Sequence, residues 1–105
     1  TRFPGVYAIG DVTRAGVPKV GVFAESMGRV AAEAIIAEIT EGQKPDAFAG
    51  KASCYIEFGV GKVGRVDMDF FAGPTPVGTF TEPSADLVTE KQHFGSSRRL
   101  RWFGQ

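Results

Sequence analysis

Residues 52–70 have the sequence ASCYIEFGVGKVGRVDMDF, and this stretch decides the fold class. In its first half apolar and polar residues alternate, and the apolar positions are Ala52, Cys54, Ile56 and Phe58. A period of two is typical of a strand with one apolar face. Residues 59–62 predict a tight turn, after which the alternation resumes with Val66, Met68 and Phe70. The stretch therefore predicts an antiparallel hairpin with one apolar face.

The segment before the hairpin, residues 23–41, has the strongest helical pattern. Its apolar residues recur at helical spacing along one stripe, at Met27, Val30, Ala31, Ala34 and Ile35. Gly42 is the predicted C-cap, and Pro45 prevents the helix from continuing.

The ends of the chain complete the predicted order. Val6-Tyr7-Ala8-Ile9 is a short apolar run between glycine-containing breaks, which predicts a buried strand. Residues 77–81 predict a short third strand of the sheet, and Ser84 is the predicted N-cap of a final helix. The fold class is therefore α+β: one buried strand and a long helix, then a small antiparallel sheet of two or three strands and a C-terminal helix.

Composition excludes several classes of protein. The chain has 105 residues, 12 basic against 12 acidic, and 43% hydrophobic residues, which is typical of a globular domain rather than a disordered chain. Zero net charge and the lack of a motif exclude nucleic acid as a predicted partner. A single cysteine cannot form an internal disulfide or a cysteine-rich zinc site, and we predict no metal site. The chain begins at Thr1 without Met, so we expect a fragment of a longer protein.

Residues 10–22 combine features that suit a ligand. Gly10 allows a ligand to approach the backbone, and the Asp11 carboxylate, at the end of the predicted strand, can accept hydrogen bonds from hydroxyl groups. The N-terminus of the next helix offers free N–H groups and a partial positive charge to an anionic group.

This region resembles the second FAD-binding motif of the pyridine nucleotide-disulfide oxidoreductase superfamily, with Thr1 and residues 6–11 matching the pattern. The resemblance implies that Asp11 hydrogen-bonds the ribityl chain of FAD. It also implies that the helix N-terminus, at Val20, Gly21 and Val22, faces the pyrimidine edge of the flavin and stabilises its reduced, anionic form.

The resemblance extends over essentially the whole chain. Further stretches are similar to the sulfide:quinone oxidoreductase and flavocytochrome c sulfide dehydrogenase branch: residues 18–25 followed by residues 30–35, the Cys54-Tyr55 strand, residues 61–64 and residues 101–104. This resemblance implies that residues 1–44 are the tail of an FAD-binding domain. It also implies that residues 45–105 are an interface region, made of a hairpin and a helix, that covers the isoalloxazine. The parent enzyme would transfer two electrons from sulfide or NAD(P)H to quinone, cytochrome or a disulfide.

One departure from the family concerns the pyrophosphate-binding glycine motif. Residues 59–64 match the pattern Gly-x-Gly-x-x-Gly. They lie between two predicted strands with no helix after them, so we reject them as a nucleotide site. Without the upstream FAD- and NAD-type domains of the parent chain, we expect the isolated chain to hold no FAD and to be inactive.

Several residues keep two interpretations. Cys54 is either a small buried hydrophobe or, as the resemblance implies, a redox cysteine whose partner lies outside this chain. Lys19 is either a solvated loop residue or a neighbour of the flavin or a quinone, and His93 is expected to be solvated. The basic and aromatic residues 91–103 either anchor the protein at a membrane surface or end a helix packed on the sheet, which leaves cytoplasm and membrane periphery both open.

The alternative function is a non-catalytic interface domain. The C-terminal domains of this superfamily often mediate dimerisation, and a piece separated from its other domains would expose the apolar surface that packs on them. On this interpretation the chain is a homo-oligomer, and the isolated chain self-associates.

Overall fold

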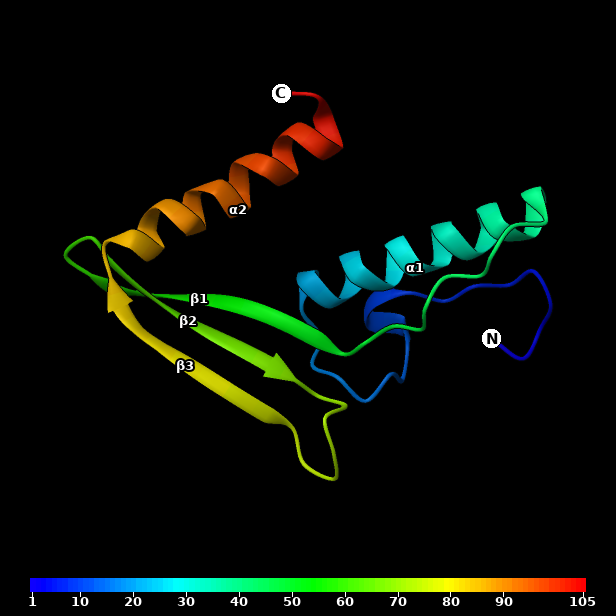
Figure 1. Cartoon of the computed structure of the whole chain (residues 1–105), viewed down its shortest axis with the longest axis horizontal. Helices are drawn as coiled ribbons and strands as arrows, with labels where there is room; N and C mark the ends of the chain where they lie inside the picture. The colour runs from blue at the N-terminus through cyan, green and yellow to red at the C-terminus, as the bar shows by residue number, and fades with distance from the viewer. The chain divides into compact units, whose positions relative to one another are not determined.

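The computed structural model describes all residues, 1–105, and gives the element order of Figure 1. A 3₁₀ turn η1 (Gly10–Val12) precedes helix α1 (Gly21–Thr40), strands β1 (Lys51–Gly59), β2 (Lys62–Asp69) and β3 (Val77–Ser84), and helix α2 (Asp86–Phe103). The strands form one antiparallel sheet in the order β1-β2-β3. The predicted α+β class is thus confirmed, with three strands in the sheet. No helix of this fold has the length and apolar character needed to cross a membrane.

The chain forms two compact units. The first contains Thr1–Ala52 and Asp69–Val77, and the second contains Ser53–Met68 and Gly78–Gln105. The chain therefore enters the second unit along β1, returns to the first after β2, and leaves it again along β3. The boundary predicted between residues 44 and 45 stays a prediction.

Phe23, at the beginning of α1, is a core residue of the first unit and lies in an aromatic cluster. The Phe23 ring meets those of Phe48 and Phe70 edge to face, with ring centroids 5.9 and 5.5 Å apart, and Phe48 meets Phe71 in the same way at 5.8 Å. Phe23 is only 2% exposed. We call these four residues the phenylalanine cluster. Since edge-to-face rings combine area burial with favourable quadrupole contacts, the cluster fixes the start of α1 within this unit.

The C-terminus of α1 differs from the prediction by one residue. Glu41, and not Gly42, has the left-handed conformation, with φ 52°. The Gly42 N–H donates to the Ala37 carbonyl at 2.9 Å, and the Thr40 hydroxyl donates to the Ile36 carbonyl at 2.8 Å. These bonds satisfy carbonyls that the last turn leaves unpaired, so the helix ends before the glycine rather than at it.

The buried strand predicted at Val6–Ile9 is wrong. These four residues are exposed and belong to no strand, because the three strands of the sheet pair only with one another. A strand needs a hydrogen-bonded neighbour, and this chain supplies none for the segment. Its start is held instead by Thr1, whose hydroxyl lies within hydrogen-bond distance of the carbonyls of Phe3 (3.1 Å) and Val6 (2.6 Å).

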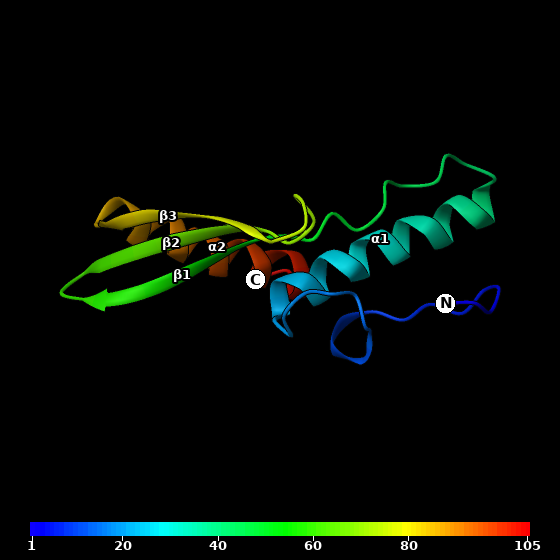
Figure 2. The same cartoon turned by 90° about the horizontal axis from the view of Figure 1, so that it is seen from below.

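In the second unit, α2 lies over one face of the sheet (Figures 1 and 2), and this face is the polar one. The Tyr55 hydroxyl and the Arg65 guanidinium donate to the Glu90 carboxylate of α2, at 2.6 and 2.7 Å. Beside them, Asp67 accepts from the Ser53 hydroxyl at 2.5 Å and from Arg65 at 2.9 Å. We call these five residues the polar cluster. It joins α2 to β1 and β2.

The opposite face of the sheet is apolar and half-exposed. Ile56, Phe58 and Phe80 are 44%, 52% and 45% exposed. The face comprises Cys54, Ile56, Phe58, Val66, Met68 and Phe80, and we call it the apolar face. The side chains predicted to alternate along the hairpin therefore do so, but α2 packs on their polar set. The interpretation of Cys54 as a buried residue is wrong, since it is exposed.

The polar cluster predicts a pH-dependent contribution to stability. Hydrogen bonds from Tyr55 and then Arg65 lower the pKa of Glu90, and those from Ser53 and Arg65 lower that of Asp67. A carboxylate with a depressed folded-state pKa stabilises the fold above its unfolded pKa of ~4, and this stabilisation disappears as the pH falls through the folded-state pKa.

We therefore expect Glu90→Gln to lower the thermal unfolding midpoint at neutral pH, and the difference from wild type to shrink as the pH is lowered below ~4. Circular dichroism melts across this range measure both effects. Glu82→Gln, at a carboxylate of β3 that forms no ion pair, is the control and should leave the midpoint unchanged. A deficit for Glu90→Gln that stays constant with pH would contradict the assignment.

Candidate functional site

The turn η1 carries the first predicted site residues. Gly10 has φ +67°, and a Cβ at this position would lie 3.3 Å from the Ala24 Cβ of α1. Both facts favour glycine here, because Gly10 packs closely on the helix, and the backbone access for a ligand that the sequence predicts stays a prediction. Asp11 follows in the exposed part of the turn, and its carboxylate makes no hydrogen bond within the chain. That carboxylate is available to a ligand.

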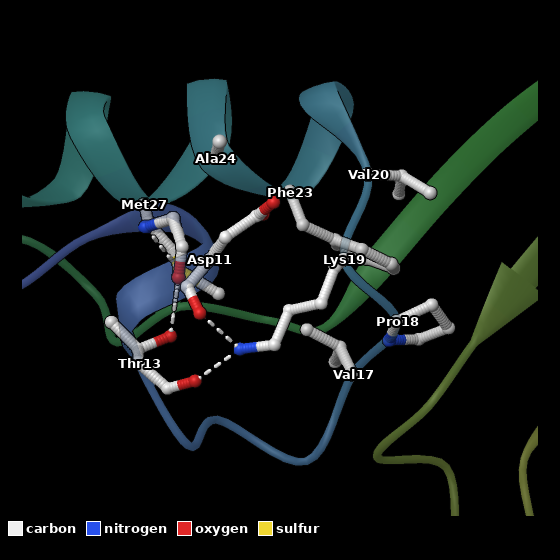
Figure 3. Close-up of a pocket in the computed structure, with 10 residues that line it drawn as sticks. Asp11, Thr13, Val17, Pro18, Lys19, Val20, Phe23, Ala24 and Met27 are labelled. Atoms are coloured by element: carbon white, nitrogen blue, oxygen red, sulfur yellow. Dashed lines mark hydrogen bonds between the residues drawn. The ribbon is translucent and has the colours of Figure 1, made fainter.

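Lys19 holds the turn from the loop that precedes α1 (Figure 3). Its Nζ donates to the backbone carbonyl of Asp11 at 2.6 Å and also to that of Thr13. The ammonium group thus donates to two backbone carbonyls. Lys19 is therefore not a freely solvated loop residue, and in this arrangement its ammonium group already has partners other than a flavin or a quinone.

Two residues that the sequence did not assign to the site hold the turn from the other side. The Gly10 N–H donates to the Met27 sulfur at 3.3 Å, and the Thr13 hydroxyl donates to the Gly10 carbonyl at 2.8 Å. Met27 was predicted only as part of the apolar stripe of the helix, and no pattern distinguishes a core methionine from one that also accepts a hydrogen bond. A hydroxyl three residues after Gly10 is a common turn pattern, and it was the one available signal for Thr13.

The N-terminus of α1 supplies the donors of the site. The Val20 N–H donates to the Pro18 carbonyl, and those of Phe23 and Ala24 return to the Val20 carbonyl. Gly21 and Val22 are left as the first N–H groups of a 20-residue helix with no side-chain cap and no acidic residue in its first turn. Of the three positions predicted at this end, Gly21 and Val22 therefore keep donors for an anionic or accepting group, and Val20 does not.

Some of the predicted residues border a shallow recess in the first unit. Gly10, Asp11, Lys19 and Val20 line it, together with Phe23, Ala24 and Met27, whereas Gly21 and Val22 do not. Pockets that enclose a drug-sized ligand usually measure about 300–1,000 Å³, whereas this recess encloses no space for even a water molecule. The Asp11 carboxylate at its border has the acceptor chemistry that the hydroxyl chain of a flavin would need, but the recess does not enclose a ligand.

Cys54, the remaining predicted site residue, lies on the apolar face of β1 in the second unit. Its side chain is exposed, and no second cysteine exists in the chain. An exposed thiol on an apolar surface is accessible to a reaction partner.

No family model, no curated protein and no solved structure matches the chain.

Proposed function

We propose that the chain is the C-terminal part of an FAD-dependent oxidoreductase and contributes one wall of its flavin site. The observation that carries this proposal is the unpartnered carboxylate of Asp11, at a recess that the first residues of α1 also border, in a helix whose N-terminus has no side-chain cap. One group accepts hydrogen bonds from hydroxyls, and the other donates to an electron-rich acceptor. FAD presents both partners, a polyhydroxyl ribityl chain and a ring that becomes anionic on reduction.

The role of each residue follows from this placement. Asp11 accepts from ribityl hydroxyls, and the N–H groups of Gly21 and Val22 donate to the pyrimidine edge of the ring. Lys19 keeps the carbonyls of the turn away from the ligand, so that the carboxylate is the exposed acceptor. When bound, FAD supplies the two-electron chemistry. The parent would move electrons from sulfide or NAD(P)H to an acceptor such as quinone or cytochrome.

Cys54 is proposed as a redox residue within this function. The Cys54 thiol lies on an apolar surface and is exposed, so a domain that covers this surface would leave the thiol in an environment with little water. Upstream domains of the parent chain would cover that surface and supply a second thiol.

A second candidate is an interface domain without activity of its own. The specific observation in its favour is the apolar face, because contiguous half-exposed apolar side chains on a small chain mark a surface for association. The two candidates are compatible, and the second requires no cofactor.

The flavin proposal is tested on the full-length natural protein. We expect it to purify with the visible absorption of a flavin, and Asp11→Asn to weaken flavin binding about ten- to a hundredfold, since a hydrogen bond to a charged group contributes ~1.5–3 kcal/mol. Asp46→Asn, in the loop after α1 and away from the recess, is the matched control and should bind as wild type does. A colourless protein that does not take up added FAD, or unchanged binding by Asp11→Asn, would overturn the proposal.

A further inference from the structure

The two edges of the sheet differ in how well they are protected. β3 contains Gly78 and Pro83, and proline lacks the N–H that a neighbouring strand would need. β1, on the other edge, runs for nine residues with no proline, and no strand of the chain pairs with its outer side. It contains Tyr55, Ile56 and Phe58, whose residue types favour strands. An edge of this kind is a template for another strand.

The charges of β1 are arranged symmetrically about its middle. Lys51 lies three residues before Cys54, and Glu57 lies three residues after it. In an antiparallel pair of two β1 strands with Cys54 opposite Cys54, each Lys51 is opposite the Glu57 of the other strand. Both residues are on the same face of the strand, because they are an even number of positions apart. The register thus forms two opposite-charge pairs and no like-charge pair.

We propose that two copies of this chain associate edge to edge through β1, antiparallel and centred on Cys54. The proposal names the surface and the partner for the interface function above, and it does not depend on flavin binding. The side chains of Lys51 and Glu57 are each 70% exposed. Their partners within the chain, Asp69 for Lys51 and Lys91 for Glu57, form exposed ion pairs of the kind that contributes little and exchanges readily.

A charge swap distinguishes the contacts between chains from those within a chain. Lys51→Glu alone and Glu57→Lys alone each place like charges opposite one another at two points, so we expect the dimer dissociation constant to rise about tenfold. The double variant Lys51→Glu/Glu57→Lys restores both cross-strand pairs, and we expect its dissociation constant to return to that of wild type.

If only the ion pairs within the chain mattered, the double variant would associate no better than the single variants, because it disrupts both of these pairs. Sedimentation equilibrium of the 105-residue chain measures all four dissociation constants, and circular dichroism checks that each variant is folded. A wild-type chain that stays monomeric at every concentration, or a double variant that associates no better than the single ones, would overturn the proposal.

Cys54 provides a second measurement that needs no charge variant. As the only cysteine, it takes a single nitroxide label, and opposite residues of an antiparallel pair have Cα atoms ~4.5–5.5 Å apart. We expect strong dipolar broadening that disappears when labelled chain is diluted with excess Cys54→Ser chain. Dimers without broadening would show that the copies associate elsewhere, for instance through the apolar face, and would overturn the β1 pairing. None of these outcomes bears on the flavin proposal, which is read from absorption.

Discussion

Phe23→Ala is expected to remove most of the stability of the first unit. The ring is almost fully buried and contacts both Phe48 and Phe70. Truncating a buried phenylalanine costs ~3–5 kcal/mol, through lost burial and the cavity that remains. A domain of this size is stable by only ~5–15 kcal/mol, so the loss is a large part of the total.

Urea denaturation followed by far-UV circular dichroism measures this change. Phe3→Ala is the control in the same unit, because Phe3 is 57% exposed and should cost less than ~0.5 kcal/mol. Equal stability of the two variants would mean that Phe23 is not a core residue of the unit.

Gly50→Ala is expected to have the next largest effect. Gly50 has φ +67°, and an added Cβ would lie 2.6–2.8 Å from three atoms of the Phe71 ring. The left-handed conformation costs a residue with a Cβ ~1–2 kcal/mol. Overpacking of a well-packed core costs ~1–3 kcal/mol, and because the Phe71 ring is 49% exposed and can move towards solvent, we apply the lower end of that range and expect a total loss of ~2–3 kcal/mol.

Gly5→Ala separates the two causes. Gly5 has nearly the same backbone conformation, φ +70°, but no atom lies within 4 Å of the position of its Cβ. It should show the conformational cost alone, ~1–2 kcal/mol. If both variants lost the same stability in urea denaturation, contact between Gly50 and Phe71 would be excluded as a cause.

The elements with local signals were predictable from the sequence. The 3.6-residue stripe of α1 and the alternation around residues 59–62 depend on side chains that are neighbours along the chain. Val6–Ile9 has the local character of a strand, yet a strand also needs a partner, and no local pattern reveals whether one is present. The side of the sheet that α2 covers was equally hidden, because it depends on Glu90 meeting Tyr55 and Arg65 across about 25 to 35 positions of sequence.

The candidate site was predictable in part. Asp11, Lys19 and Val20 were all predicted as site residues, and they border one recess because the loop between them is short, whereas Gly21 and Val22 lie outside its lining. The hydrogen bonds of Lys19 to backbone carbonyls were not predictable, since a lysine has no sequence signal for carbonyl partners. Met27 is both buried in the core and an acceptor, through its sulfur, of the Gly10 N–H, and hydrophobic periodicity predicts only its burial.

The order in which the chain visits its two units limits how its gene can be rearranged. Phe70 and Phe71 lie on the return segment Asp69–Val77, which follows β1 and β2 in sequence but belongs to the same unit as α1. A single breakpoint anywhere between α1 and the end of β2 would leave Phe23 on one product and Phe70 on the other. Recombination exchanges contiguous stretches, so it cannot transfer either unit whole without carrying residues of the other. The two units are therefore expected to be inherited as one block.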